Sequence, residues 1–208
     1  MTIEELKNSL IVNDITMVSR SRLDNLQFCI EEVVKNNISG HFIETGVWRG
    51  GSCIFMRAIL KSLEILDRKV FVADSFKGFP IPKYNWDKGA DFLDDSRLKV
   101  SVDEVKKNFE RYSLLDNQVV FVEGYFSDTL PKLDNVFSLI RLDGDLFEST
   151  IDSLVNLYDK VSIGGFIIID DYGLECCSQA VNQFRSMNNI TEPMIQIDEF
   201  GLYWKKER

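Results

Sequence analysis

The chain has 208 residues, of which 45% are hydrophobic, and it carries a formal net charge of −9. This length and composition exclude a disordered chain and predict one well-buried domain that spans residues 1–208. The acidic excess argues against nucleic acid or an anionic membrane as a partner, because both attract an excess of lysine and arginine. A small neutral or cationic molecule is therefore the expected partner.

Residues 1–39 are expected to form an N-terminal helical segment. Within it, apolar residues recur at helical spacing from Leu23 to Val34, and Ser21 is placed to cap the helix. The apolar face of this helix offers a surface for pairing two subunits. A homo-oligomer is therefore an open expectation.

From residue 41 onward, short apolar runs alternate with helical patterns. The predicted strands are His41 to Thr45, Lys69 to Asp74, Val119 to Glu123, Phe137 to Asp143, and Phe166 to Asp170. The predicted helices are Cys53 to Leu63, Val102 to Tyr112 with a capping box from Ser101 to Glu104, Ser149 to Tyr158, and one through Ala180, Val181 and Phe184. Such alternation predicts a Rossmann-like, doubly wound α/β fold with helices on both faces of a mostly parallel sheet.

The C-terminal segment breaks this alternation. Two apolar runs, Met194 to Ile197 and Leu202 to Trp204, are separated by only four residues, which predicts an antiparallel hairpin at the edge of a seven-stranded sheet. The other irregular stretch covers residues 77–98. Its length is typical of a functional insertion, so a lid or an acceptor-binding segment is expected there.

The loop after the first strand carries the first candidate site. Glu44 lies at the end of the strand, and Gly46, Gly50 and Ser52 lie in the loop that leads into the following helix. Glycines let the backbone approach a ligand, and a helix start attracts a carboxylate. The spacing differs from the dinucleotide pattern, which disfavours an NAD-dependent enzyme and suits the carboxylate and amino group of S-adenosylmethionine. An ordinary strand-to-helix turn is the alternative.

Two further strand ends suit the nucleoside part of that ligand. Asp74 follows the second strand at the position where a carboxylate accepts the hydroxyls of a ribose, although Asp74 and Ser75 would serve equally well as a helix cap. After the third strand, Gly124 and Phe126 are candidates for contacts with adenine. Here the alternative is that Ser127 caps a short helix.

Asp143, Asp170 and Asp171 follow the two remaining parallel strands. Adjacent strand ends bring these carboxylates to one edge of the sheet, where they repel one another unless they are protonated or bind a cation. A hard ion such as Mg²⁺ prefers oxygen ligands. A metal site is therefore predicted, with solvent-exposed turn residues as the alternative.

Four segments together resemble the macrocin O-methyltransferase family, in chain order from about Gly40 to Phe184. They are ETGVWRGG at 44–51, DSFKGFP at 74–80, RLDGDLFEST at 141–150 and GGFIIIDDY at 164–172. The family includes enzymes that methylate sugar hydroxyls on macrolide and aminocoumarin antibiotics. The resemblance implies a class I methyltransferase fold that binds S-adenosylmethionine and Mg²⁺.

By this resemblance, the metal ligands are Asp143, Asp170 and Asp171. The metal would hold two neighbouring oxygens of a sugar diol and lower the pKa of the hydroxyl to be methylated. The complete set of expected cofactor contacts is Glu44, Gly46, Gly50, Ser52, Asp74, Ser75, Gly124, Phe126 and Asp143.

The general base is less clearly indicated. Catechol-type relatives use a lysine three residues after the first aspartate, where this chain has Leu146. The only histidine, His41, starts a strand at the opposite end of the sheet and is expected to be structural. This leaves a carboxylate as the base, and the candidates are Asp143, Asp170 and Asp145.

The identity of the acceptor stays open at this point. The chain is shorter than the antibiotic-pathway enzymes, mainly at the N-terminus, where part of the acceptor pocket is usually built. The sugar acceptor is therefore expected to be either a natural product or a glycan or nucleotide-sugar precursor, and both alternatives stay open. The aromatic residues of the 77–98 segment either stack on a sugar or seal the cofactor: Phe79, Tyr84, Trp86 and Phe92. The rival functions are a catechol-type phenolic O-methyltransferase and a non-catalytic protein that binds S-adenosylmethionine.

The cysteines bear on the location of the protein. Cys29, Cys53, Cys176 and Cys177 follow no regular spacing, which suits neither a disulfide framework nor a zinc site. The start of the chain lacks a basic and apolar leader, and no run reaches membrane-spanning length. A cytoplasmic protein with reduced thiols is expected.

Overall fold

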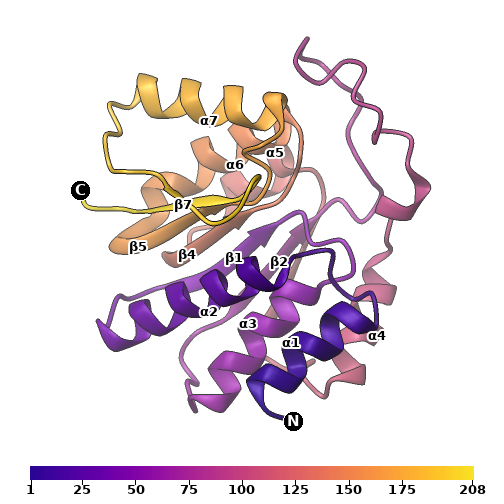
Figure 1. Ribbon diagram of the computed structural model, residues 1–208, viewed down its shortest axis with the longest axis vertical. Coiled ribbons are helices and arrows are strands. Elements are labelled where there is room, and N and C mark those ends of the chain that lie inside the picture. The colour runs from indigo at the N-terminus through magenta and orange to yellow at the C-terminus, as the bar shows by residue number, and fades with distance from the viewer.

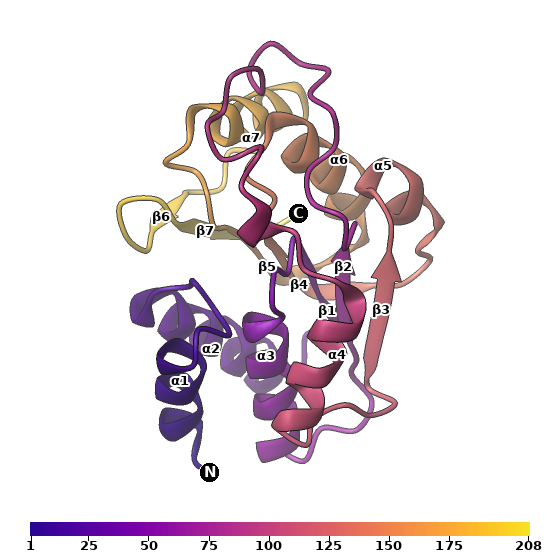
Figure 2. The same cartoon turned by 90° about the vertical axis from the view of Figure 1, so that its right-hand side faces the viewer.

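The computed structural model describes residues 1–208 and contains one seven-stranded sheet between two layers of helices (Figures 1 and 2). The strand order is β3-β2-β1-β4-β5-β7-β6. The first five strands are parallel, whereas β7 runs antiparallel to both β5 and β6. The strands are β1 His41–Thr45, β2 Val70–Asp74, β3 Val119–Glu123, β4 Phe137–Leu142, β5 Val161–Ile169, β6 Ile195–Gln196 and β7 Leu202–Lys205.

The helices divide between the two faces of the sheet, as Figure 2 shows. On one face lie α1 Ile3–Val12, α2 Arg20–Lys35, α3 Gly51–Ser62 and α4 Val102–Arg111. On the other face lie α5 Phe126–Thr129, α6 Phe147–Leu157 and α7 Glu175–Met187. Short 3₁₀ helices cover Ser96–Leu98, Leu130–Lys132 and Tyr158–Lys160. The predicted doubly wound fold with an antiparallel C-terminal hairpin is confirmed.

The central strands are apolar on both sides because helices cover both faces. All six residues of β4 are buried, and so are the last five of β5. Alternate residues of each strand enter different cores: Leu139 packs with the N-terminal helices, and Ile140 packs with α6 and α7. Continuous aliphatic runs of this kind are typical of parallel strands that are covered on both sides.

The N-terminal segment differs from the sequence prediction. Helix α2 begins at Arg20, and Ser19 caps it by accepting a hydrogen bond from the amide of Arg22, so the predicted cap at Ser21 is wrong. The preceding helix α1 lies within the expected N-terminal helical segment, but it was not predicted as a separate helix. A capping box between Thr2 and Glu5 starts α1, whose inner face is buried in the main core.

Other boundaries differ by a few residues. Helix α6 begins at Phe147, two residues before its predicted start at Ser149. Strand β5 begins at Val161, five residues before its predicted start at Phe166. Ser101 caps α4 as predicted. However, the carboxylate of Glu104 lies 3.6 Å from Arg49, so the predicted reciprocal half of the capping box is not formed. None of the helices combines the length and the apolar character needed to cross a bilayer.

Candidate functional site

A cavity of about 650 Å³ opens at the carboxyl ends of the parallel strands. At this edge the strand order reverses between β1 and β4, which is where open α/β sheets bind their ligands. The cavity is lined by residues from all of the predicted strand ends and by Thr16, Met17 and Val18 from the segment before α2.

The glycine-containing loop lies against the end of β4. Gly46 has φ +84, and a side-chain Cβ there would lie 1.9 Å from the carbonyl oxygen of Asp143, so no other residue fits. Gly50 also has positive φ and begins α3 without a side-chain cap. The first amides of α3 are therefore open to an anionic group, and Ser52 in the same turn lines the cavity.

Asp74 organises this loop from the end of β2. Its carboxylate accepts hydrogen bonds from the amides of Val47 at 2.9 Å and Phe76 at 2.8 Å. Burial raises the pKa of Asp74, and these bonds oppose the rise. No helix starts here, so the alternative of a helix cap at Asp74 and Ser75 is wrong, and both residues line the cavity.

The end of β3 forms another wall of the cavity. Gly124 has φ +141 and is followed by Tyr125 and Phe126, which line the cavity. The ring of Phe126 lies beside Gly144, next to Ser149 of α6. Tyr125, and not Ser127, occupies the position before α5, so the capping alternative for Ser127 is wrong.

Arg141 lies at the centre of the site and was missed by sequence reasoning. Its guanidinium donates hydrogen bonds to Glu44, Asp143 and Asp170, and its side chain is only 2% exposed. The missed signal was an arginine inside the apolar run of β4, because such a charge needs buried partners. Burial raises the pKa of Glu44 to about 7, although Arg141 acts in the opposite direction.

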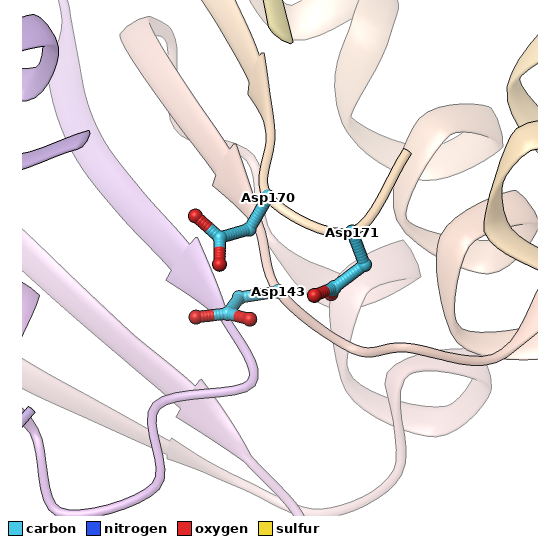
Figure 3. Close-up of side chains that lie close together, drawn as sticks. All are labelled: Asp143, Asp170 and Asp171. Carbon is cyan, nitrogen blue, oxygen red and sulfur yellow. The ribbon is translucent and has the colours of Figure 1, made fainter. Parts of the chain in front are cut away.

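The three predicted metal ligands come together, as Figure 3 shows. Each of Asp143, Asp170 and Asp171 offers a carboxylate oxygen, and these oxygens lie within 4.8 Å of one another. Burial raises the pKa of Asp170 to about 6, and burial also raises the pKa of Asp171, with repulsion from neighbouring aspartates adding to both. Three oxygen donors this close suit a hard divalent cation such as Mg²⁺. We call these three residues the aspartate cluster.

Asp145 lies beside the aspartate cluster and lines the cavity. Its backbone has φ +57, and its amide donates to the carboxylate of Asp171 at 3.2 Å. Burial raises the pKa of Asp145 to about 8, with Asp143 and Asp170 adding to the rise. Asp145 has no cationic partner within ion-pair distance, unlike Asp143 and Asp170.

Arg22 is a second residue that sequence reasoning missed. It extends from α2 to the carboxylate of Asp170, at 2.6 Å, and to that of Asp198 in the turn between β6 and β7, at 2.7 Å. These partners lie 148 and 176 residues away in the chain, so no local pattern indicated them. In contrast, His41 lies at the opposite end of β1 and accepts a hydrogen bond from the amide of Lys69.

The 77–98 segment contributes only part of its aromatic residues to the cavity. Phe79 and Phe92 line it and pack on each other at 5.4 Å between ring centroids. Tyr84 packs instead on Phe147 at 4.9 Å, and Trp86 is exposed outside the cavity. Leu146, where catechol-type enzymes have a lysine, is fully buried.

The strand order and this site define an O-methyltransferase with a class I methyltransferase fold. The chain belongs to the macrocin O-methyltransferase family, because residues 12–206 match the family described as Macrocin-O-methyltransferase (TylF). The family resemblance of the sequence motifs and the prediction of an enzyme are thereby confirmed.

Individual relatives support the same assignment. The chain is 48% identical over 200 residues to demethyldecarbamoylnovobiocin O-methyltransferase of Streptomyces niveus, a match that covers 93% of this chain and 76% of that protein. It is 40% identical over 204 residues to mycinamicin III 3''-O-methyltransferase of Micromonospora griseorubida, and this match covers 92% of this chain and 78% of that protein. The solved structure of the O-methyltransferase NovP superposes with a TM-score of 0.90 and 46% identity, covering 93% of this chain and 82% of that chain.

Proposed function

We propose that this protein is an S-adenosylmethionine-dependent and Mg²⁺-dependent O-methyltransferase that acts on a sugar hydroxyl. The observation that carries the proposal is the aspartate cluster, which lies in the same cavity as the glycine-containing loop and Asp74. One relative, 47% identical over 201 residues, is named as a 4'-O-methyltransferase of a rhamnosyl-tetracenomycin from Streptomyces olivaceus. The sugar part of the proposal rests on such names.

The proposed cofactor site runs along the strand ends. The open amides at the start of α3, near Gly50 and Ser52, suit the methionine carboxylate, and the acidic Glu44 beside them suits its amino group. Asp74 retains lone pairs for the ribose hydroxyls beyond the bonds it already accepts. The remaining proposed contacts are Gly46, Ser75, Phe126 and Asp143, which line the cavity, and Gly124, which directly precedes the lining residue Tyr125.

The proposed metal ligands are the aspartate cluster. When bound there, Mg²⁺ would supply Lewis-acid chemistry by lowering the pKa of an acceptor hydroxyl. The same cavity is also lined by Met17, Phe79, Phe92 and Phe200, whose apolar surfaces suit the flat face of a sugar ring. We propose that the 77–98 segment covers the acceptor while it reacts, because Phe79, Pro80 and Phe92 of this segment line the cavity.

Among the candidate bases, we favour Asp145. Asp143 and Asp170 both form ion pairs with Arg141 and are both proposed metal ligands, so their oxygens already have cationic partners. Asp145 has no such partner, and it lines the cavity beside the aspartate cluster, where its carboxylate can accept a proton from a bound acceptor. In this proposal, the Asp145 carboxylate removes the hydroxyl proton while the acceptor oxygen bonds to the methyl carbon. The bond between that carbon and the sulfonium sulfur breaks, and the products are the methyl ether and S-adenosylhomocysteine.

The two rival functions give different results in one assay. The protein is incubated with labelled S-adenosylmethionine and Mg²⁺, and methyl transfer is measured to sugar diols and to catechols, with and without a chelator. Chelator-sensitive transfer to a sugar supports the proposal, whereas preference for a catechol favours the phenolic alternative. Calorimetric binding of S-adenosylhomocysteine without transfer to any acceptor would indicate a non-catalytic binding protein.

A further inference from the structure

Arg22 connects three segments that are distant in the sequence. It lies in the first turn of α2, and its guanidinium binds Asp198 through two hydrogen bonds, at 2.7 Å and 3.0 Å. The same guanidinium donates a third bond, at 2.6 Å, to Oδ2 of Asp170. Asp198 therefore holds Arg22 in the orientation in which its remaining nitrogen reaches the aspartate cluster.

The contact with Arg22 leaves neither oxygen of Asp170 free. Oδ1 accepts from Arg141 and Oδ2 accepts from Arg22. By contrast, Asp171 forms no ion pair with either arginine. A divalent cation that uses Asp170 as a ligand must therefore compete with a guanidinium for it, and the positive charges of the arginine and the cation repel each other.

The two arginines differ in how readily they can release the carboxylate of Asp170. Arg141 projects from the middle of the sheet, has a side chain only 2% exposed, and also binds Glu44 and Asp143. Arg22 is 15% exposed at the start of a helix, and Asp198 is available as a partner when its bond to Asp170 is broken. Arg22 is thus the arginine that can release Asp170 without becoming an unpaired buried charge.

We propose that Arg22 is an internal counter-ion of the aspartate cluster. It pairs with Asp170 when no metal is bound, and it breaks this contact and keeps only its pair with Asp198 when a divalent cation binds. Arg22 thereby lowers the affinity of the site for the cation and stabilises the aspartate cluster in the metal-free protein. This inference rests on the proposed metal site. It assigns Arg22 and Asp198 a positioning role, and neither is a metal ligand.

The test is titration of the protein with Mn²⁺, with free Mn²⁺ measured by electron paramagnetic resonance in the absence of cofactor and acceptor. Arg22→Gln is expected to bind Mn²⁺ at least about tenfold more tightly than the wild type, because one repelling charge is removed. Asp198→Asn is expected to bind it more weakly, since Arg22 then has only Asp170 as a carboxylate partner. In the Arg22→Gln background, the effect of Asp198→Asn is expected to shrink.

Arg20→Gln is the matched control, because Arg20 lies in the same helical turn and pairs only with exposed residues away from the cavity. Simple damage to the fold would weaken Mn²⁺ binding in every variant. Tighter binding to Arg22→Gln therefore distinguishes the loss of a repelling charge from damage to the fold. Unchanged or weaker binding by Arg22→Gln, while Asp143→Ala abolishes binding, would overturn this inference and leave the metal site in place. If neither the wild type nor Arg22→Gln binds Mn²⁺, both proposals fail.

Discussion

At the scale of single residues, the site is built from carboxylates that serve different purposes. Asp74 fixes a loop by accepting two amide hydrogen bonds, Glu44 and Asp143 neutralise a buried arginine, and Asp145 has no cation beside it. The sequence placed these acids at strand ends but gave no means of ranking their roles. The ranking comes from the contacts that each carboxylate makes in the folded protein.

Asp74→Ala is expected to weaken the binding of S-adenosylhomocysteine about 10- to 100-fold, the usual cost of losing hydrogen bonds to a charged group. Isothermal titration calorimetry measures the change. The affinity of Asp74→Asn, which keeps the shape of the side chain, should lie between the affinities of the wild type and Asp74→Ala. Asp134→Ala, at an exposed position, is the control. Equal affinity of wild type and Asp74→Ala would exclude a contact between Asp74 and the ribose.

Asp145→Asn is expected to lower kcat by roughly 100-fold or more, the usual contribution of a general base. Binding of S-adenosylhomocysteine should stay within the error of the wild-type value, because the shape of the cavity is kept. Asp152→Asn is a suitable control, since Asp152 lines the same cavity from α6. If Asp145→Asn retains the wild-type rate, a metal-held aspartate becomes the better candidate for the base.

At the scale of elements, contacts between segments complete the helices. Helix α6 begins at Phe147, and the preceding residue, Leu146, supplies no capping side chain. Instead, the carboxylate of Asp87 from the 77–98 segment accepts hydrogen bonds from the amides of Phe147 at 2.6 Å and Glu148 at 3.1 Å. Asp87 is fully buried. A cap supplied from 60 residues away has no signature in the sequence around α6.

Asp87→Ala is expected to lower the free energy of unfolding by about 1 to 2 kcal/mol, the range for loss of a helix cap. Urea denaturation measures this value. The same change should increase proteolysis within residues 77–98, because the segment loses its buried attachment to α6. Asp91→Ala is the control, since Asp91 is exposed in the same segment. Unaltered stability and proteolysis would show that Asp87 does not hold the segment in place.

Leu10→Ala is expected to destabilise the protein by roughly 2 to 5 kcal/mol, the usual cost of deleting a buried leucine side chain. Leu10 is fully buried in the main core, although it belongs to the N-terminal helix α1. Val12→Ala in the same helix should have little effect, because Val12 is 83% exposed. Equal stabilities for the two variants, measured by thermal unfolding, would mean that α1 packs only loosely.

At the scale of the whole molecule, acidic charge is concentrated where the sheet opens. The chain has a net charge of −9. At the site, the carboxylates of Glu44, Asp198 and the aspartate cluster have only two arginines as partners, Arg22 and Arg141. The fold holds these carboxyl groups together, so a cation that binds them also stabilises the folded chain.

Mg²⁺ at about 100 times its dissociation constant should stabilise the folded protein by about 2.7 kcal/mol. Differential scanning fluorimetry should therefore show a melting temperature several degrees higher than in a chelator. Asp170→Ala should abolish this increase, and Na⁺ at the same ionic strength should not reproduce it. An increase of equal size in Asp170→Ala would mean that the ion acts elsewhere on the molecule.

The sequence by itself determined the order of the strands and helices, the antiparallel hairpin, the glycine-containing loop and the acids at the strand ends. Each of these has a local signal: the period of apolar residues, the placement of glycine, or an acid directly after an apolar run. Helix α1 also has a local signal, the capping box from Thr2 to Glu5.

The tertiary structure alone decided the partners of those acids. Arg22 reaches Asp170, Asp87 caps α6, and Arg141 joins Glu44 to the aspartate cluster, all through contacts between residues far apart in the chain. Such contacts depend on how the strand ends and loops converge in space, and a charged side chain carries no periodic pattern that identifies its partner. For this reason the sequence located the site, whereas the fold determined which of its carboxylates are neutralised and which remain free to act.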